Sequence, residues 1–149
     1  MADLIHKKLF AVKNVGYSLS ADVTLMNRDL IVNLSGGDLP HLGGIVSFDQ
    51  QTGKIEQVYF ASHDGRKHKD ILLAKLFVDQ IADQVPGNLC VTAGIHIDGI
   101  TAAQIKASYP MTSELAMEVA EWVKNFELDF IDPRYTTHLK DFKSREVKR

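Results

Sequence analysis

Alternating apolar and polar residues in the first two-thirds of the chain predict a series of β-strands. Between Tyr17 and Leu25, apolar side chains occupy every second position and polar side chains occupy the positions between them. This period of two is typical of a strand that buries one side and exposes the other. Strand character recurs in residues 9–13, 30–34, 44–49 and 55–61. Because short turns join these segments, we expect the five strands to form an antiparallel meander.

Two of the predicted turns carry residues suited to a left-handed backbone. Asn27, which Arg28 follows, tolerates this conformation, and Gly53 adopts it without steric cost. We therefore expect a tight turn at each of these positions.

The apolar spacing changes after residue 61. Apolar residues then recur at intervals of three and four, which predicts a helix from roughly Lys69 to Val85 with one buried face. Pro86 and Gly87 are expected to end this helix. Residues 89–97 return to a period of two and predict a sixth strand.

Two more helices are predicted toward the C-terminus. Thr101 and Gln104 form a capping box, so a short helix is expected to begin there. Pro110 is expected to end it, because proline lacks the backbone N–H that a helix needs. A longer amphipathic helix is predicted from about Ser113 to Phe130.

Together these elements predict an α+β fold. We expect a mostly antiparallel six-stranded sheet with helices packed on one face, in two layers. At 149 residues the chain has the size of one domain, spanning residues 1–149. Its polar, basic tail, from about residue 134 to residue 149, is expected to be flexible.

Composition narrows the class of protein. A net charge of -2 gives no electrostatic reason to expect nucleic acid as a partner. Cys90 is the only cysteine, so no intrachain disulfide can form, which favours the cytoplasm. No apolar run approaches the ~20 residues that cross a bilayer, and the N-terminal residues lack the apolar core of a signal peptide. We therefore expect a cytoplasmic protein that binds neither nucleic acid nor membranes.

The first segment with candidate chemistry is SGGDLPHLGG, residues 35–44. Its glycines allow the backbone to approach a ligand closely, and free N–H groups there can bind an anion. The simpler alternative is a strained loop between two strands. The candidate binding residues in this segment are Gly36, Gly37, Asp38, His41, Gly43 and Gly44.

The second segment, residues 62–69, joins the fifth strand to the first helix. Backbone N–H groups at a helix N-terminus attract phosphate, whereas cations are unfavourable there unless an anion is present. The basic side chains of this segment therefore suggest an anionic ligand, and the alternative is a solvated basic turn. The candidate residues are His63, Arg66, Lys67 and His68.

The third segment, residues 94–101, follows the sixth strand. His96 and Asp98 lie two residues apart, on the same side of the strand. They are candidate binding residues, and the alternative is a histidine that binds a neighbouring carboxylate to hold the turn.

Chain topology predicts that the three segments converge. The fifth and sixth strands flank a helix, so they run parallel and their outgoing loops lie at the same sheet edge. The third strand of a meander runs parallel to the fifth, so the loop that follows it reaches that edge as well. Ligands of α/β proteins commonly bind at such an edge.

Several common active sites are not expected. The sequence contains no H-E-x-x-H or C-x-x-C metal spacing, no G-x-S-x-G elbow, no P-loop and no G-x-G-x-x-G motif. We therefore expect neither a metal centre nor a Ser-His-Asp hydrolase. Trp122 is interpreted as a core residue or a dimer contact.

Three strings, GGDLPHLGG, HDGRKHKD and VTAGIHIDGIT, together resemble the prenylated flavin chaperone family called LpdD-like, over roughly Tyr17 to Ser108. The resemblance implies a fold similar to proteasome-assembly-chaperone subunits, and a homodimer. It implies a protein that is not an enzyme. Such a protein would hold reduced prenylated FMN and load it into a UbiD-type decarboxylase, as in gallate decarboxylase systems. A flavin prenyltransferase is a further partner to expect.

On this interpretation the glycine-rich segment and Arg66 with Lys67 suit the phosphate of the cofactor, and His41 and His96 suit its ring system. Two alternatives stay open. One is a decarboxylase subunit whose histidines take part in acid–base catalysis. The other is an assembly protein that binds the decarboxylase but no flavin.

Overall fold

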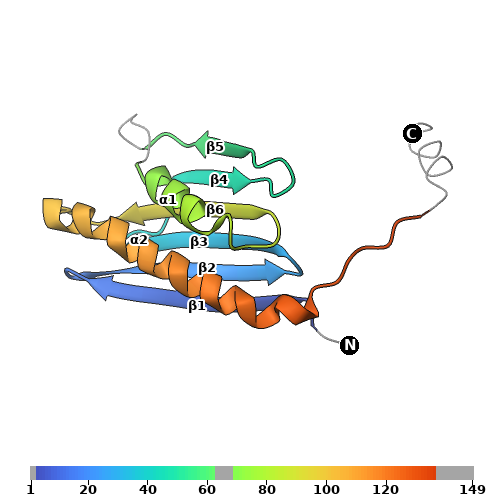
Figure 1. The fold of residues 1–149 in the computed structure, drawn as a ribbon. Coiled ribbons are helices and arrows are strands. Elements are labelled where there is room, and N and C mark those ends of the chain that lie inside the picture. The colour runs from blue at the N-terminus through green and yellow to red at the C-terminus, as the bar shows by residue number, and fades with distance from the viewer. Residues whose placement is uncertain (1–2, 63–68, 137–149) are drawn as a thin grey trace.

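The computed structural model describes residues 3–62 and 69–136, which form one β-sheet with two α-helices on the same face (Figure 1). Four of the five strand pairings are antiparallel. The predicted two-layer α+β fold is therefore confirmed. The strands are β1 (Ile5–Asn14), β2 (Tyr17–Met26), β3 (Asp29–Gly37), β4 (Gly44–Phe48), β5 (Ile55–Tyr59) and β6 (Leu89–His96).

The prediction of a five-stranded meander is wrong. The strand order is β1-β2-β3-β6-β4-β5, so β6 lies between β3 and β4. It pairs parallel with β3 and antiparallel with β4. The inner side chains of β6, Leu89, Val91 and Ala93, are at most 2% exposed. An apolar strand is covered best at the centre of a sheet. The free energy gained by burying β6 there outweighs the tendency of β3 and β4, which a short loop connects, to pair with each other.

The turns follow the sequence prediction. Asn27 has a φ of 52° and Gly53 has a φ of 74°, so both adopt the left-handed conformation. The first strand, by contrast, is longer than its apolar stretch, because it pairs with β2 along its whole length. Pairing with a neighbour thus extends a strand beyond the residues that show strand character on their own.

Helix α1 (Ile71–Ile81) confirms the first predicted helix, although it is shorter than residues 69–85. It packs on the inner face of the sheet, against β4 and β6. The side chains that it buries are Ile71, Leu73, Ala74, Phe77, Val78 and Ile81.

Helix α2 (Ala102–Val123) corrects the prediction of two separate helices, since it continues through Pro110. The backbone hydrogen bond that Pro110 cannot donate is missing on the solvent-exposed side of the helix. Pro110 and Lys106 are both exposed, so water can bind the Lys106 carbonyl that loses its helical donor. On the opposite side Met111 and Leu115 are buried, and their packing holds the two halves in one helix.

The last turn of the predicted helix is a 3₁₀ helix, η1 (Lys124–Asp129). Trp122 lies just before it, and its ring makes edge contacts with Phe10 and Phe126. These contacts place Trp122 against the core between α2 and β1. Among the residues that the structure describes, no helix is long and apolar enough to span a membrane.

The predicted capping box at the start of α2 is present. The Thr101 hydroxyl accepts from the Gln104 backbone N–H at 3.1 Å, and the Gln104 side chain accepts from the Thr101 N–H at 3.0 Å. The Gln104 amide also donates to the carbonyl of Val15 at 3.1 Å. The cap therefore fixes the helix start against the turn between β1 and β2.

Thr101→Ala is expected to lower the free energy of unfolding by about 1 kcal/mol, because one N–H of the first helical turn loses its acceptor. Urea denaturation followed by circular dichroism measures this change. Thr101→Ser keeps an oxygen at the same position and should cost less than half as much. Equal losses for the two variants would contradict a role for the hydroxyl as the cap.

Candidate functional site

The three candidate segments leave the sheet at one edge. Strands β3 and β6 are parallel, and β5 runs the same way because β4 is antiparallel to both β5 and β6. The carboxyl ends of β3, β5 and β6 therefore point to the left in Figure 1, where α1 and α2 begin. The topological argument for convergence thus holds, although the strand order on which it was based does not.

The glycine-rich loop, residues 38–43, crosses the end of β6 to connect β3 with β4. Its first and last residues are anchored to β6, with Asp38 N–H donating to the His96 carbonyl at 2.6 Å and Gly43 N–H donating to the Ala93 carbonyl at 2.8 Å. The crossing is very close. A Cβ atom on Gly94 would overlap the backbone carbonyl of His41.

Packing explains most of the candidate glycines. A Cβ on Gly36 would collide with the Ser18 carbonyl, and one on Gly44 would press against the side chain of Ile71. Gly37 has a φ of 77° and faces the His96 carbonyl. These contacts agree with the simpler alternative of a constrained loop. Close approach of this backbone to a ligand stays a prediction.

His41 is held by the first helix. Its Nε2 lies 2.9 Å from Oδ2 of Asp70, and its Nδ1 lies 3.1 Å from the Leu39 carbonyl oxygen. Both partners of the ion pair are largely buried, with side chains 23% and 14% exposed. Asp70 is the N-cap residue of α1, and its side chain binds His41 instead of a helix N–H. The loop is thereby tied to the start of α1.

Asp70 is a site residue that the sequence analysis missed. The available signal was an aspartate directly before an apolar helical pattern, which is typical of an N-cap. Its contact with His41, 29 residues earlier, depends on the loop crossing β6 and has no local sequence pattern.

Asp38 connects the glycine-rich loop to the segment that follows β6, and His96 forms a pair within that segment. Asp38 Oδ2 accepts from the Asp98 N–H at 2.9 Å, and His96 Nε2 lies 2.9 Å from Asp98 Oδ1. The His96 and Asp98 side chains are exposed, at 48% and 83%. This is the histidine–carboxylate pair of the simpler alternative, but its exposure also leaves both groups accessible to a ligand.

The structure brings Gly36, Gly37, Asp38, His41, Gly43, Gly44, His96 and Asp98 to this edge. The remaining candidates, His63, Arg66, Lys67 and His68, lie outside the described residues. Their contacts therefore stay predictions. The chain on either side of them, at Tyr59 and Asp70, reaches the same edge.

Nucleophiles and metal ligands do not cluster in the part of the chain that the structure describes. No group of three or more His, Cys, Asp or Glu side chains there is arranged to hold a metal ion. Burial raises the pKa of the Cys90 thiol, so little thiolate forms near neutral pH and the thiol is a weak nucleophile.

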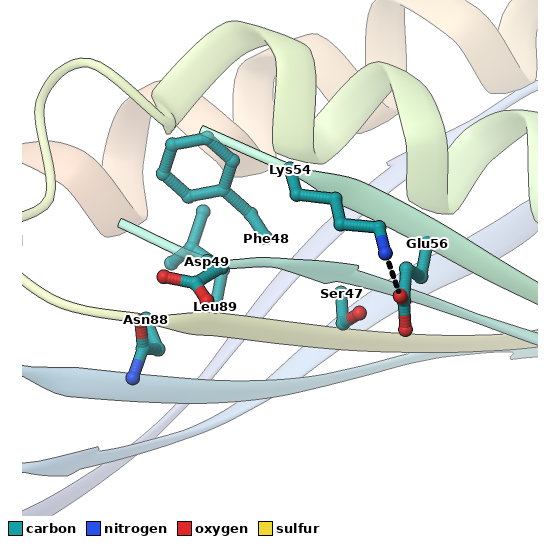
Figure 2. Close-up of a pocket in the computed structure, with 7 residues that line it drawn as sticks. All are labelled: Ser47, Phe48, Asp49, Lys54, Glu56, Asn88 and Leu89. Atoms are coloured by element: carbon teal, nitrogen blue, oxygen red, sulfur yellow. Dashed lines mark ion pairs between the residues drawn. The ribbon is translucent and has the colours of Figure 1, made fainter. Parts of the chain in front are cut away.

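A pocket of about 290 Å³ lies at the opposite end of the sheet, beside the β4–β5 turn (Figure 2). The polar groups that line it stabilise that turn. Lys54 binds Glu56 at 2.9 Å, Asp49 accepts from Gln51 N–H at 2.9 Å, and Asn88 accepts from Gln50 N–H at 3.0 Å. Because these groups are already bound to one another or to the backbone of the turn, this pocket is a weaker candidate than the loop edge.

A family model described as "Prenylated flavin chaperone LpdD-like domain" matches residues 13–124. Protein LpdD of Lactiplantibacillus plantarum is 34% identical over 126 residues, which is 85% of this chain and 92% of that protein. The chain belongs to the LpdD-like family. Membership confirms the resemblance seen in the sequence and supports a chaperone role.

The LpdD-like domain has the fold of a second group of chaperones. A chain from a chaperone complex for yeast 20S proteasome assembly superposes with a TM-score of 0.54 and 12% identity, covering 81% of this chain and 98% of that one. At this identity the likeness concerns the fold alone, which agrees with the architecture expected from the sequence.

Gly94→Ala is expected to displace the glycine-rich loop, because the new methyl group would occupy the position of the His41 carbonyl. Hydrogen exchange of the Asp38 and Gly43 amides should accelerate. The Gly53 amide, which donates to the Asp49 carbonyl in the distant β4–β5 turn, should stay protected. Gly99→Ala is the control for a substitution at the same edge without a collision, since nothing lies within 4 Å of a Cβ there and its φ of 61° adds only backbone strain. Unchanged loop amides in Gly94→Ala would contradict the close crossing.

Proposed function

We propose that the protein binds reduced prenylated FMN at the loop edge and delivers it to a UbiD-type decarboxylase, without catalysing a reaction itself. Membership of the LpdD-like family carries this proposal. The geometry of the edge supports it, because loops 38–43 and 97–101 present histidine and aspartate side chains beside the start of a helix.

The cofactor has chemical features that this edge can recognise. The N-terminus of α1 is the positive end of the helix dipole, which attracts a phosphate, and Arg66 and Lys67 precede it in the sequence. The Asp70 carboxylate at this helix end would repel phosphate, and His41, 2.9 Å away, would offset that repulsion in its protonated form. His96, which is half exposed, is available to the polar ring system.

A carrier must also release its ligand. Each histidine and aspartate side chain described at the edge has a partner within the protein, since His41 binds Asp70, His96 binds Asp98 and Asp38 accepts from the Asp98 N–H. The loops therefore stay held when the ligand leaves. We further propose a homodimer in the cytoplasm, with a flavin prenyltransferase as the source of the cofactor. The sheet face opposite the helices would then be covered.

Arg66→Ala or Lys67→Ala is expected to weaken binding of reduced prenylated FMN by roughly 10- to 100-fold, as for the loss of a charge-assisted hydrogen bond. Anaerobic absorbance titration measures this. Lys54→Ala, at the opposite end of the sheet, is the matched control and should bind normally. The dephosphorylated cofactor should bind the wild type poorly, and its affinity should be the same for the variants. Equal losses for both forms would show that the basic turn contacts another group.

His41→Ala is expected to weaken cofactor binding and slow loading of the apo-decarboxylase. The decarboxylase, once loaded and separated, should run at its normal rate with or without added protein. If His41 instead performs acid–base catalysis, the decarboxylase rate should depend on the added protein and fall by about 10²–10⁴-fold with the variant, at unchanged flavin affinity. That second result would replace the carrier with a catalytic subunit. His96→Ala should behave like His41→Ala, and His6→Ala, which removes a histidine stacked on Phe126, is the control.

A further inference from the structure

The chain that follows α2 forms a C-terminal arm, defined here as residues 127–136, whose base is clamped to the β2–β3 turn. The Asn27 amide donates to the Ile131 carbonyl at 2.9 Å and accepts from the Ile131 N–H at 3.0 Å. Arg28 donates to the same carbonyl at 2.9 Å and pairs with Asp132 at 2.8 Å. The guanidinium also lies 5.9 Å from the centre of the Phe130 ring. The direction in which the arm leaves is therefore set by specific contacts.

The arm exposes large apolar side chains before, at and beyond this clamp. Leu128 in η1 is 100% exposed, the clamped Ile131 is 55% exposed and Tyr135 beyond it is 83% exposed. Figure 1 shows the described chain after η1 leading away from the sheet and helices. An apolar segment that is held at its base and directed into solvent is typical of a binding element.

The arm also carries the carboxylates of Glu127 and Asp129, together with Asp132, which pairs with Arg28, and the cation Arg134. It lies outside residues 13–124, which match the family model.

A complementary surface lies on the outer side of β1. Residues at odd positions of this strand face away from the helices, because Phe10 at an even position packs on Trp122. The outer side therefore presents Ile5, Lys7, Leu9 and Lys13 in that order along the strand, with Ile5 and Leu9 53% and 65% exposed. Apolar side chains that alternate with lysines match the apolar side chains and carboxylates of the arm.

The base of the arm and the beginning of β1 meet at one corner of the sheet, where the Asn27 N–H donates to the Leu4 carbonyl at 2.7 Å. In a two-fold pair each contact is made twice, so an arm that packs on β1 of the second copy leaves its own β1 to the arm of that copy. The arm leads away from its own sheet, so its own β1 is not the surface that it covers.

We propose that the arm of one copy packs on the outer side of β1 of a second copy. Leu128, Ile131 and Tyr135 would cover Ile5 and Leu9. Glu127 and Asp129 would face Lys7 and Lys13. This inference rests on the homodimer in the proposed function, but not on the identity of the ligand.

Sedimentation equilibrium of the full chain tests the apolar contact. The wild type should sediment near twice the chain mass of 16.6 kDa at micromolar concentration. Leu128→Ser with Tyr135→Ser should raise the dimer dissociation constant by at least tenfold, since each side chain loses apolar burial in both arms. Met117→Ser with Tyr109→Ser, exposed apolar residues of α2, is the matched control and should leave it unchanged. A monomeric wild type, or equal constants for wild type and arm variant, would overturn the proposal.

Charge reversal tests the pairing of the two surfaces. Lys7→Glu with Lys13→Glu should weaken the dimer, and so should Glu127→Lys with Asp129→Lys. All four substitutions in one chain should restore it, because the arm and the strand are then complementary again. Failure of the combined variant to recover would show that the arm does not contact this strand.

Two further measurements separate this proposal from the proposed function. Binding of reduced prenylated FMN to the arm variant should match the wild type, because the arm lies at the opposite end of the sheet from the loop edge. If the wild type dimerises through the arm but binds no flavin, the proposed function is wrong and the arm contact still stands. An arm variant that dimerises normally but no longer loads the apo-decarboxylase would overturn the present inference and assign the arm to the decarboxylase.

Discussion

The close crossing of the glycine-rich loop over β6 is the constraint on which the candidate site depends. Because β6 is paired on both sides, the chain can pass from β3 to β4 only across the end of β6. The six residues of the loop make that crossing at backbone contact distance, which requires a residue without a side chain at Gly94. The same crossing carries His41 to Asp70 and Asp38 to the Asp98 amide. One packing requirement thus positions residues from three separate segments.

This arrangement changes how the polar residues of the edge are understood. The histidines and carboxylates described there are engaged with one another, His41 with Asp70 and His96 with Asp98. They hold the loops in place, and in the proposed function they also exchange these partners for polar groups of the cofactor. A site of this kind, formed by loops and partly open to water, is suited to holding a ligand that must later be handed over.

The far end of the sheet is organised by the β2–β3 turn. Asn27 allows the tight turn through its left-handed backbone and also clamps the C-terminal arm through its side-chain amide. Arg28 adds an ion pair and a ring contact to the same clamp. This two-residue turn therefore fixes the register of β2 and β3 and the direction in which the arm leaves the domain. The turn and the arm lie at the end of the sheet opposite the proposed ligand edge (Figure 1).

Local patterns in the sequence were enough to predict the strands, helix α1, the Asn27 and Gly53 turns and the capping box at Thr101, because each depends on neighbouring residues alone. They were also enough to indicate the edge that holds Asp38, His41 and His96. They did not determine the place of β6 between β3 and β4, since burial of a central strand is a property of the whole sheet. Nor did they predict that α2 continues through Pro110, which depends on Met111 and Leu115 packing against the sheet, with the Lys106 carbonyl left to water. The pairing of His41 with Asp70 was decided by tertiary structure as well, because only the crossing over β6 brings those two residues together.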